Sequence, residues 1–174
     1  MARALLVAIA VLVAVPARAD SFGDRLNAYY ASRRGYLEVK DDVLRWHHTT
    51  RNGCVAFAST ALRHLGVEIG EAQKIDGEGV SRITRVFVEY LEAELGWTRI
   101  TDSTQLAKGD LVFTTDVPGL PGYPAHVVMF TGWADRKREV ARVIDNQGFK
   151  RRRAMHPPAD SDVDPFAFAL RAPE

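Results

Sequence analysis

Three segments between residues 22 and 95 carry apolar side chains at the helical spacing of three and four positions. Each segment that this spacing predicts to be a helix is followed by a glycine, a residue common just after a helix end. The middle helix opens at Cys54, directly after the turn-forming pair Asn52-Gly53, and Ser81 is the expected N-cap of the last one. Residues 46–53 are expected to be irregular. The predicted helices cover 22–34, 54–65 and 81–95, and the glycines after them are Gly35, Gly66 and Gly96.

After residue 96 the pattern changes to short apolar or alternating runs, which are typical of β-strands. A turn at 108–110 and a Pro- and Gly-rich loop at 117–124 separate some of these runs, and Gly132 is expected to end the strand that starts at His126. Helices first and strands afterwards indicate an α+β fold, in which N-terminal helices, including the one that opens at Cys54, pack on an antiparallel sheet. The predicted strands are 97–100, 111–115, 126–131, 139–145 and 166–171.

The N-terminus has the pattern of a secretory signal peptide. A positive start is followed by an uninterrupted apolar run over 4–15 and by an A-x-A cleavage site at 17–19. The run is too short to span a bilayer, and no cysteine follows the cleavage site to carry a lipid. We therefore expect residues 1–19 to be removed and residues 20–174 to form a single exported domain, periplasmic or extracellular, without a membrane anchor.

Composition and charge limit the remaining classes of function. The chain has 174 residues, 47% of them hydrophobic and 26% charged, which is typical of one globular domain. Removal of residues 1–19 takes away Arg3 and Arg18 and no acidic residue, so the formal net charge falls from +1 to −1, which argues against a nucleic-acid-binding protein. The basic cluster at 150–153 is interpreted as a solvated turn, and the alternative is a patch for an anionic surface or substrate. We expect a monomer.

Cys54 is the single cysteine of a chain that we expect to be exported. Export leads to a compartment that favours disulfides, yet Cys54 has no internal partner. At the start of a helix, its sulfur would lie beside unpaired backbone N–H groups and the positive end of the helix dipole, which favour the thiolate. Because the thiolate is the reactive form, Cys54 is the candidate nucleophile.

A catalytic thiolate needs an imidazole as its proton partner, and five histidines compete for that role. His64 would lie three helical turns from Cys54, roughly 15 Å away, which excludes it as the base. His156 falls in a loop near the C-terminus. The adjacent pair His47 and His48 lies in a segment expected to be irregular, and it makes no recognised metal-ligand spacing with nearby acids. We therefore predict neither a metal site nor a cofactor.

His126 is the strongest candidate because it starts a predicted strand directly after the Pro- and Gly-rich loop, where its side chain can point into a cleft. In an antiparallel hairpin, the end of the second strand lies beside the start of the first. The strand over 139–145 therefore brings Asp145 close to His126, where a carboxylate can orient the imidazole. Asn146 and Gln147 are also polar, and a register shift of one residue would exchange neighbours, so both remain alternatives for the third role.

Three short blocks of the sequence contain the candidate residues or a glycine turn, in a fixed order: Asn52–Phe57, Lys108–Phe113 and Ala125–Phe130. Together they resemble the NlpC/P60 and CHAP superfamily of papain-like peptidoglycan hydrolases. The resemblance implies a papain-like α+β fold, a cysteine nucleophile on a helix, a histidine at a strand start and a third polar residue on the next strand. These roles fall on Cys54, His126 and Asp145. The implied activity is cleavage of an amide or peptide bond in peptidoglycan or its stem peptides.

The residues around the nucleophile place the resemblance nearer to the CHAP branch. NlpC/P60 enzymes usually have Asp-Cys-Ser-Gly-Phe here, whereas this chain has Gly-Cys-Val-Ala-Phe over 53–57, so only Cys and Phe agree. Recognition of a stem peptide with a free amino terminus is therefore not implied, and cleavage at a muramoyl-alanine amide or within a cross-bridge both stay open. Trp46, Tyr123 and Trp133 are candidates for lining the substrate cleft.

Two other functions fit the same residues. In a secreted binding module, Cys54 would be a small buried apolar residue with an unreactive thiol, and His126 would lie far from it. In a papain-like acyl or peptidyl transferase, an amine instead of water would capture the thioester formed at Cys54. The hydrolase is the preferred hypothesis, because a lone exported thiol in a reactive setting at a helix start is best explained by catalysis.

Overall fold

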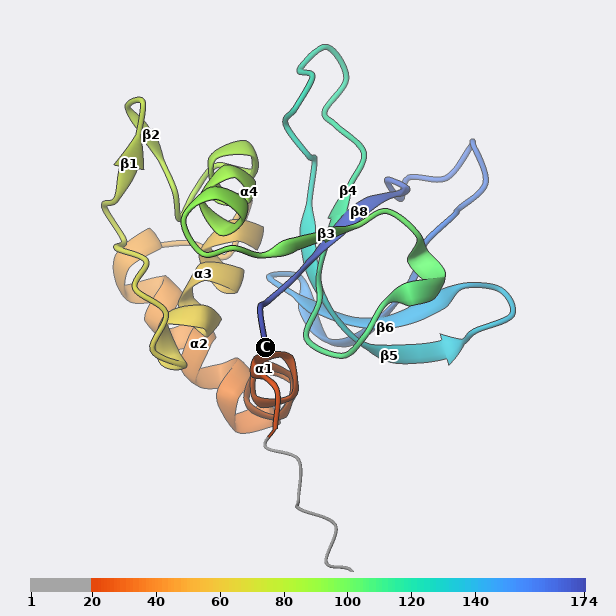
Figure 1. Ribbon diagram of the computed structural model, residues 1–174, viewed down its shortest axis with the longest axis horizontal. Helices are drawn as coiled ribbons and strands as arrows, with labels where there is room; N and C mark the ends of the chain where they lie inside the picture. Colours follow the sequence, from red (N-terminus) through yellow and green to blue (C-terminus); the bar gives the residue numbers. More distant parts are fainter. Residues whose placement is uncertain (1–19) are drawn as a thin grey trace, which may run out of the picture.

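The computed structural model describes residues 20–174 and confirms the α+β class. Figure 1 shows helices α2 to α4 gathered on one side of the molecule and most of the strands on the other. The packing partners of the helices include both one another and the sheet, so the two halves share one core. The helices of the described residues are α1 Phe22–Tyr30, α2 Arg33–His47, α3 Cys54–His64 and α4 Thr84–Ala93.

Six strands form an antiparallel sheet in the order β3-β8-β4-β5-β6-β7. The chain runs through β4 to β7 in spatial order, and its last strand, β8, inserts between β3 and β4. The bounds are β3 Thr98–Ile100, β4 Leu111–Thr114, β5 Val127–Asp135, β6 Val140–Asp145, β7 Gly148–Ala154 and β8 Phe166–Arg171. Two further strands of two residues each, β1 Lys74–Ile75 and β2 Glu78–Gly79, form a separate hairpin before α4.

Helix α3 packs on the sheet against β5 and β6, as the sequence predicts. Its buried residues, such as Phe57, belong to one apolar cluster with Met129 of β5 and Ile144 of β6. Alternate residues of the same strands, Val128 and Val143, point to the other face of the sheet and belong to a second, smaller cluster. Because apolar residues bury almost the whole of α3, the residue that opens this helix is fixed relative to β5 and β6.

The predicted helix over 22–34 is wrong at its end, because α1 stops at Tyr30 and α2 starts at Arg33. Gly35 does not end a helix; it lies buried in the first turn of α2, where the Ser32 hydroxyl accepts a hydrogen bond from its N–H at 2.9 Å. A Cβ atom at Gly35 would lie 2.1 Å from the Tyr29 carbonyl oxygen. The glycine therefore permits a close approach between two consecutive helices, and it is not the stop signal that the sequence suggested.

Other parts of the structure also differ from the prediction, among them Trp46 and His47, which were expected to be irregular and belong to α2. Helix α4 begins at Thr84, because the Ser81 hydroxyl donates to the Gly70 carbonyl and does not cap the helix. Strand β5 continues through Gly132, where a shift in the pairing register absorbs a φ of 140°. The basic cluster at 150–153 is not a solvated turn, because it forms the middle of β7 and pairs with β6.

The predicted signal peptide, residues 1–19, lies outside the described residues. Within residues 20–174, no helix has the length and apolar character needed to cross a membrane.

The turn before β4 supplies a prediction about stability. Gly109 has a φ of +89°, and a Cβ atom there would lie 2.2 Å from the Gly23 carbonyl oxygen at the start of α1. Gly96 also has a positive φ, +66°, but nothing lies within 4 Å of its Cβ position. Gly96→Ala should therefore lower the free energy of unfolding by about 1–2 kcal/mol, from backbone strain alone. Gly109→Ala should lower it by roughly 3 kcal/mol or more, because overlap of the new Cβ atom with the Gly23 carbonyl adds to the strain.

Urea unfolding of the two variants and the wild type, followed by circular dichroism, measures these losses. Equal losses for Gly96→Ala and Gly109→Ala would show that the contact between the 108–110 turn and α1 does not constrain the fold.

Candidate active site

Cys54 is the first residue of α3, and the local sequence places it there by a tight turn. Asn52 has a φ of +52°, and the Gly53 N–H donates to the Thr50 carbonyl at 3.3 Å. The Gly53 carbonyl then accepts the first helical hydrogen bond, from the Phe57 N–H at 2.9 Å. No side chain caps the helix at Gly53, so the N–H groups of the first turn receive no acceptor from the N-cap residue.

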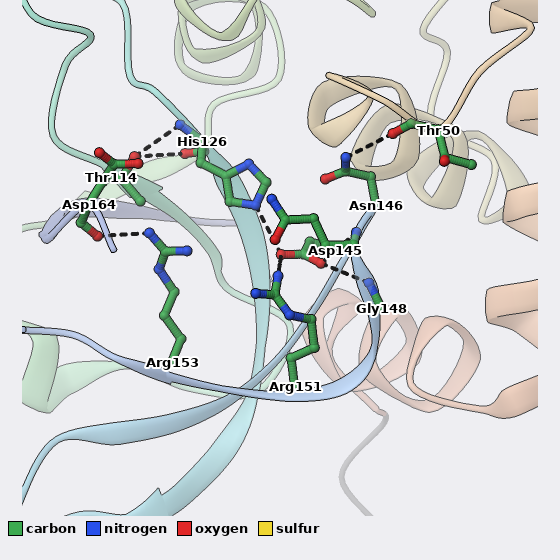
Figure 2. A network of polar contacts seen from close by, with 10 residues as sticks. Thr50, Thr114, His126, Asp145, Asn146, Gly148, Arg151, Arg153 and Asp164 are labelled. Atoms are coloured by element: carbon green, nitrogen blue, oxygen red, sulfur yellow. Dashed lines mark hydrogen bonds and ion pairs between the residues drawn. The ribbon is translucent and has the colours of Figure 1, made fainter. Parts of the chain in front are cut away.

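His126 directly precedes β5, and Thr114 of β4 holds its backbone from both sides. The His126 N–H donates to the Thr114 hydroxyl at 2.9 Å, and the Thr114 N–H donates to the His126 carbonyl at 3.1 Å. Figure 2 shows the contact of the His126 N–H with the Thr114 hydroxyl, and the imidazole ring pointing away from it, toward Asp145. The side chain is 10% exposed, so the ring lies in a largely buried and fixed position.

Asp145 is the last residue of β6, and its buried carboxylate accepts four hydrogen bonds. The imidazole Nε2 of His126 donates to Oδ2 at 2.9 Å, and Nη1 of Arg151 donates to the same oxygen at 2.6 Å. The other oxygen, Oδ1, accepts from the backbone N–H groups of Gln147 at 2.8 Å and Gly148 at 3.1 Å. All of these donors except His126 lie in the turn between β6 and β7 or in β7 itself (Figure 2).

The two alternative third residues lie nearby, but no hydrogen bond of the described residues joins their side chains to the imidazole. Asn146 points toward α3, and its Nδ2 donates to the Thr50 carbonyl at 2.9 Å. This bond ties the turn after β6 to the loop that precedes Cys54. Gln147 contributes its backbone N–H to Asp145, and the residue lines the same cavity as Cys54. Of the three candidates, Asp145 is the one that the structure joins to His126.

Burial and hydrogen bonding act in opposite directions on this pair. Burial alone would lower the pKa of His126, but the hydrogen bond to Asp145 and the interaction with the Cys54 thiol outweigh it and raise the pKa from 6.5 to about 9. For Asp145, burial opposes the charged form, whereas the hydrogen bond and charge of His126 and the charge of Arg151 lower its pKa below the usual value. At neutral pH the pair is therefore an imidazolium and a carboxylate.

Cys54 and His126 line one cavity of about 760 Å³ at the junction of the helices and the sheet. Tyr123 lines it, as the sequence analysis expects, and its hydroxyl donates to Glu78 at 3.2 Å. The other segments of the wall are the loop at 50–52, residues 82–84, the loop at 117–125, the turn and strand at 146–153 and the loop at 162–164.

The two tryptophans proposed for the cleft are not among the residues that line this cavity. Trp46 lies at the end of α2, where the guanidinium groups of Arg63 and Arg82 stack on its ring at 5.2 and 5.6 Å from the centroid. Trp133 packs edge to face on Phe130, at 5.0 Å between ring centroids, in the cluster on the far face of the sheet. Aromatic residues pack in cores as readily as they line clefts, so their type alone does not place them.

His64 and His156 have other partners. His64 binds Asp42 at 2.9 Å, and His156 lies 3.3 Å from Glu139, both away from the cavity. Burial, followed by the charge of Arg82, lowers the pKa of His47. Among residues 20–174 there is no cluster of three or more His, Cys, Asp or Glu side chains that could hold a metal ion.

Arg151 is the site residue that is missing from the sequence-based candidates. Its signal lies in the alternation of β7: Arg151 and Arg153 are partly buried and line the cavity, whereas Lys150 and Arg152 are exposed. Four consecutive basic residues hide this period of two, because every position is polar. Recognition of the segment as a strand would have placed alternate arginines on the face that Asp145 occupies.

Comparison with known proteins gives no match of this chain to a family model, to a curated protein or to a solved structure. The functional argument therefore depends on the geometry of the site and on the chemistry of its residues.

The pKa of His126 is expected to depend on the charge of Asp145. In a ¹H–¹³C or ¹H–¹⁵N NMR titration, the wild-type imidazole should titrate with a pKa of about 9. Asp145→Asn should bring this pKa down by 1 unit or more, because the amide keeps the shape of the side chain but removes the charge that stabilises the imidazolium. A wild-type value near 6.5, unaffected by Asp145→Asn, would contradict the ion pair.

Arg151 should tune this pair from the other side. Arg151→Gln removes a positive charge next to Asp145, so the carboxylate attracts the imidazolium more strongly and the pKa of His126 should rise above that of the wild type. Arg152→Gln is the matched control, because Arg152 is exposed on the opposite side of β7. The same NMR titration measures both variants. An identical shift in both, or none in Arg151→Gln, would show that the contact with Asp145 does not influence the imidazole.

Proposed function

We propose that the protein is an exported cysteine hydrolase of papain-like fold that cleaves an amide or peptide bond in peptidoglycan. Cys54 is the nucleophile, His126 the proton donor and acceptor, and Asp145 the residue that orients His126. The observation that carries this proposal is the meeting of the three groups: a thiol at a helix start and an imidazole in one cavity, with the imidazole bonded to a buried carboxylate.

The geometry supports a defined sequence of proton transfers. Nε2 of His126 binds Asp145, which leaves Nδ1 as the nitrogen for Cys54. The Cys54 thiolate attacks the amide carbonyl, a C–S bond forms, and the C–N bond breaks as the imidazolium gives its proton to the leaving amine. Neutral His126 then removes a proton from water, which attacks the thioester and releases a carboxylic acid and the Cys54 thiolate, so that the thiolate and the imidazolium are restored. Asp145 remains an anion throughout and stabilises the imidazolium each time it forms.

The start of α3 also offers a binding site for the oxyanion. Negative charge develops on the carbonyl oxygen when the thiolate attacks, and backbone N–H groups of a first helical turn can stabilise it. Gly53 provides no side-chain cap that would compete for these donors. This arrangement favours a catalytic role of Cys54 over a purely structural one.

The topology supports the papain-like assignment. A helix that opens with the cysteine packs on an antiparallel sheet, the histidine stands at the start of one strand, and the aspartate ends the next strand. The 108–113 block has a structural part in this arrangement, because buried Asp110 accepts from the Ala107 N–H at 2.7 Å and from Arg171 at 2.8 and 2.9 Å. These bonds fix the start of β4, the strand that holds the backbone of His126. The binding-module hypothesis expects His126 far from Cys54, which this geometry disfavours.

Digestion of purified peptidoglycan tests the proposal. The protein is expected to release soluble fragments whose new amino ends, identified by mass spectrometry, reveal the bond that is cleaved. Cys54→Ala and His126→Ala should each lower the initial rate by at least about 10³-fold, because they remove the nucleophile or its proton partner. His156→Gln is the control, since this histidine lies outside the cavity. Undiminished release by Cys54→Ala would refute a cysteine mechanism.

Addition of an amine acceptor such as glycinamide to the same reaction separates hydrolysis from transfer. The proposed hydrolase should give mainly the free carboxylic acid. A product dominated by the glycinamide adduct would instead assign the transferase activity to the same three residues.

A further inference from the structure

The cavity that contains Cys54 has an excess of positive side chains. Its lining includes four arginines and two aspartates besides the reacting residues. Removal of the predicted signal peptide leaves a net charge of −1, so this excess is a local property of the cavity wall and not of the whole chain. The arginines are Arg51, Arg82, Arg151 and Arg153, and the aspartates are Asp162 and Asp164.

Two of the arginines are bound within the protein, and two are not. Arg151 binds the Asp145 carboxylate, and Nη2 of Arg153 donates to the Asp164 carbonyl oxygen at 2.8 Å. In the described part of the chain, Arg51 and Arg82 have no ion-pair partner. Their charges therefore remain available to a ligand that enters the cavity.

Arg82 is held in place although it has no anionic partner. Its guanidinium stacks on the Trp46 ring, and its aliphatic carbons lie 3.5–3.6 Å from the position that a Cβ atom of Gly79 would occupy. A guanidinium that is already positioned loses less conformational freedom when it binds an anion. This contact also explains the position of Trp46, which packs against Arg82 and does not line the cavity itself.

We propose that Arg82, together with Arg51, forms an anion subsite that binds a carboxylate group of the substrate beside the bond that Cys54 attacks. A guanidinium presents paired N–H donors that match the two oxygens of a carboxylate. The inference deepens the proposed function and rests on it, because it takes Cys54 as the reacting group. The substrate class that it names is an acyl donor with a free carboxylate near the scissile amide.

Competing charges in the cavity do not cancel the two arginines. Asp162 and Asp164 lie in the loop between β7 and β8, where Asp164 interacts with Arg153, whereas Arg51 precedes α3 and Arg82 precedes α4. On the side of the cavity formed by the helices, the charge of Arg82 also acts on His47. Burial is the main cause that lowers the pKa of His47, and the Arg82 charge is the second.

Alkylation of Cys54 by two reagents tests the subsite without any substrate. Iodoacetate and iodoacetamide both form a C–S bond with the thiolate and release iodide, but only iodoacetate carries a carboxylate. The two rate constants are measured by mass spectrometry at low ionic strength. The ratio of the iodoacetate to the iodoacetamide rate constant should fall roughly 3- to 10-fold in Arg82→Gln, as expected for loss of one nearby charge. The ratio should be retained in Arg82→Lys, and high salt should reduce it in the wild type.

Lys137→Gln is the matched control, since it removes one positive charge from the exposed turn after β5, at the far end of the strand from His126. An unchanged ratio in both Arg82→Gln and Arg51→Gln, or an equal fall in Lys137→Gln, would overturn the subsite.

The outcome is separate from that of the proposed function. The ratio needs only an accessible thiol, so it can be measured even if the protein does not cleave peptidoglycan. If cleavage is found, a peptide substrate with a free carboxylate and its carboxamide analogue complete the test. Arg82→Gln should raise KM for the carboxylate form and leave that of the carboxamide unaltered, and an equal effect on both would contradict recognition of the charge.

Discussion

The Asp145 carboxylate has no exposed side-chain surface, and two cationic donors meet at its Oδ2 atom, His126 at 2.9 Å and Arg151 at 2.6 Å. A carboxylate buried without partners would cost several kcal/mol of folding free energy and would become protonated. Here four hydrogen bonds keep it charged, and the rest of the site depends on that charge. It holds the imidazole in one orientation, keeps it protonated, and joins the start of β5 to β7 across β6.

The site forms where the helical half and the sheet half of the molecule meet. Cys54 belongs to the helices, whereas His126 and Asp145 belong to the sheet, so the geometry requires a fixed relation between the halves. Burial of α3 against β5 and β6 provides most of it. The Asn146 side chain adds a direct link, because it bonds to the Thr50 carbonyl in the loop that precedes Cys54.

Much of the site could be predicted from sequence because its signals are local. A glycine turn before an apolar helix placed Cys54, and hairpin topology alone brought Asp145 to His126. The parts that were not predicted depend on tertiary contacts. From sequence alone, Gly35 has the pattern of a helix stop, and only the packing of the Tyr29 carbonyl against it shows its other role. Arg151 is one of four consecutive basic residues, and it is distinguished from the others only once β7 is known to be a strand. Trp46 and Trp133 show the same limit, since their chemistry suits a cleft and the packing places them elsewhere.

The central claim is that Cys54 and His126 act as an ion pair, and the rate of Cys54 alkylation by iodoacetamide at neutral pH tests it most directly. The rate constant should be at least about tenfold higher in the wild type than in His126→Ala, because an imidazolium beside the sulfur favours its reactive form. Equal rate constants for the two proteins would contradict the ion pair and, with it, the assignment of Cys54 as a catalytic nucleophile.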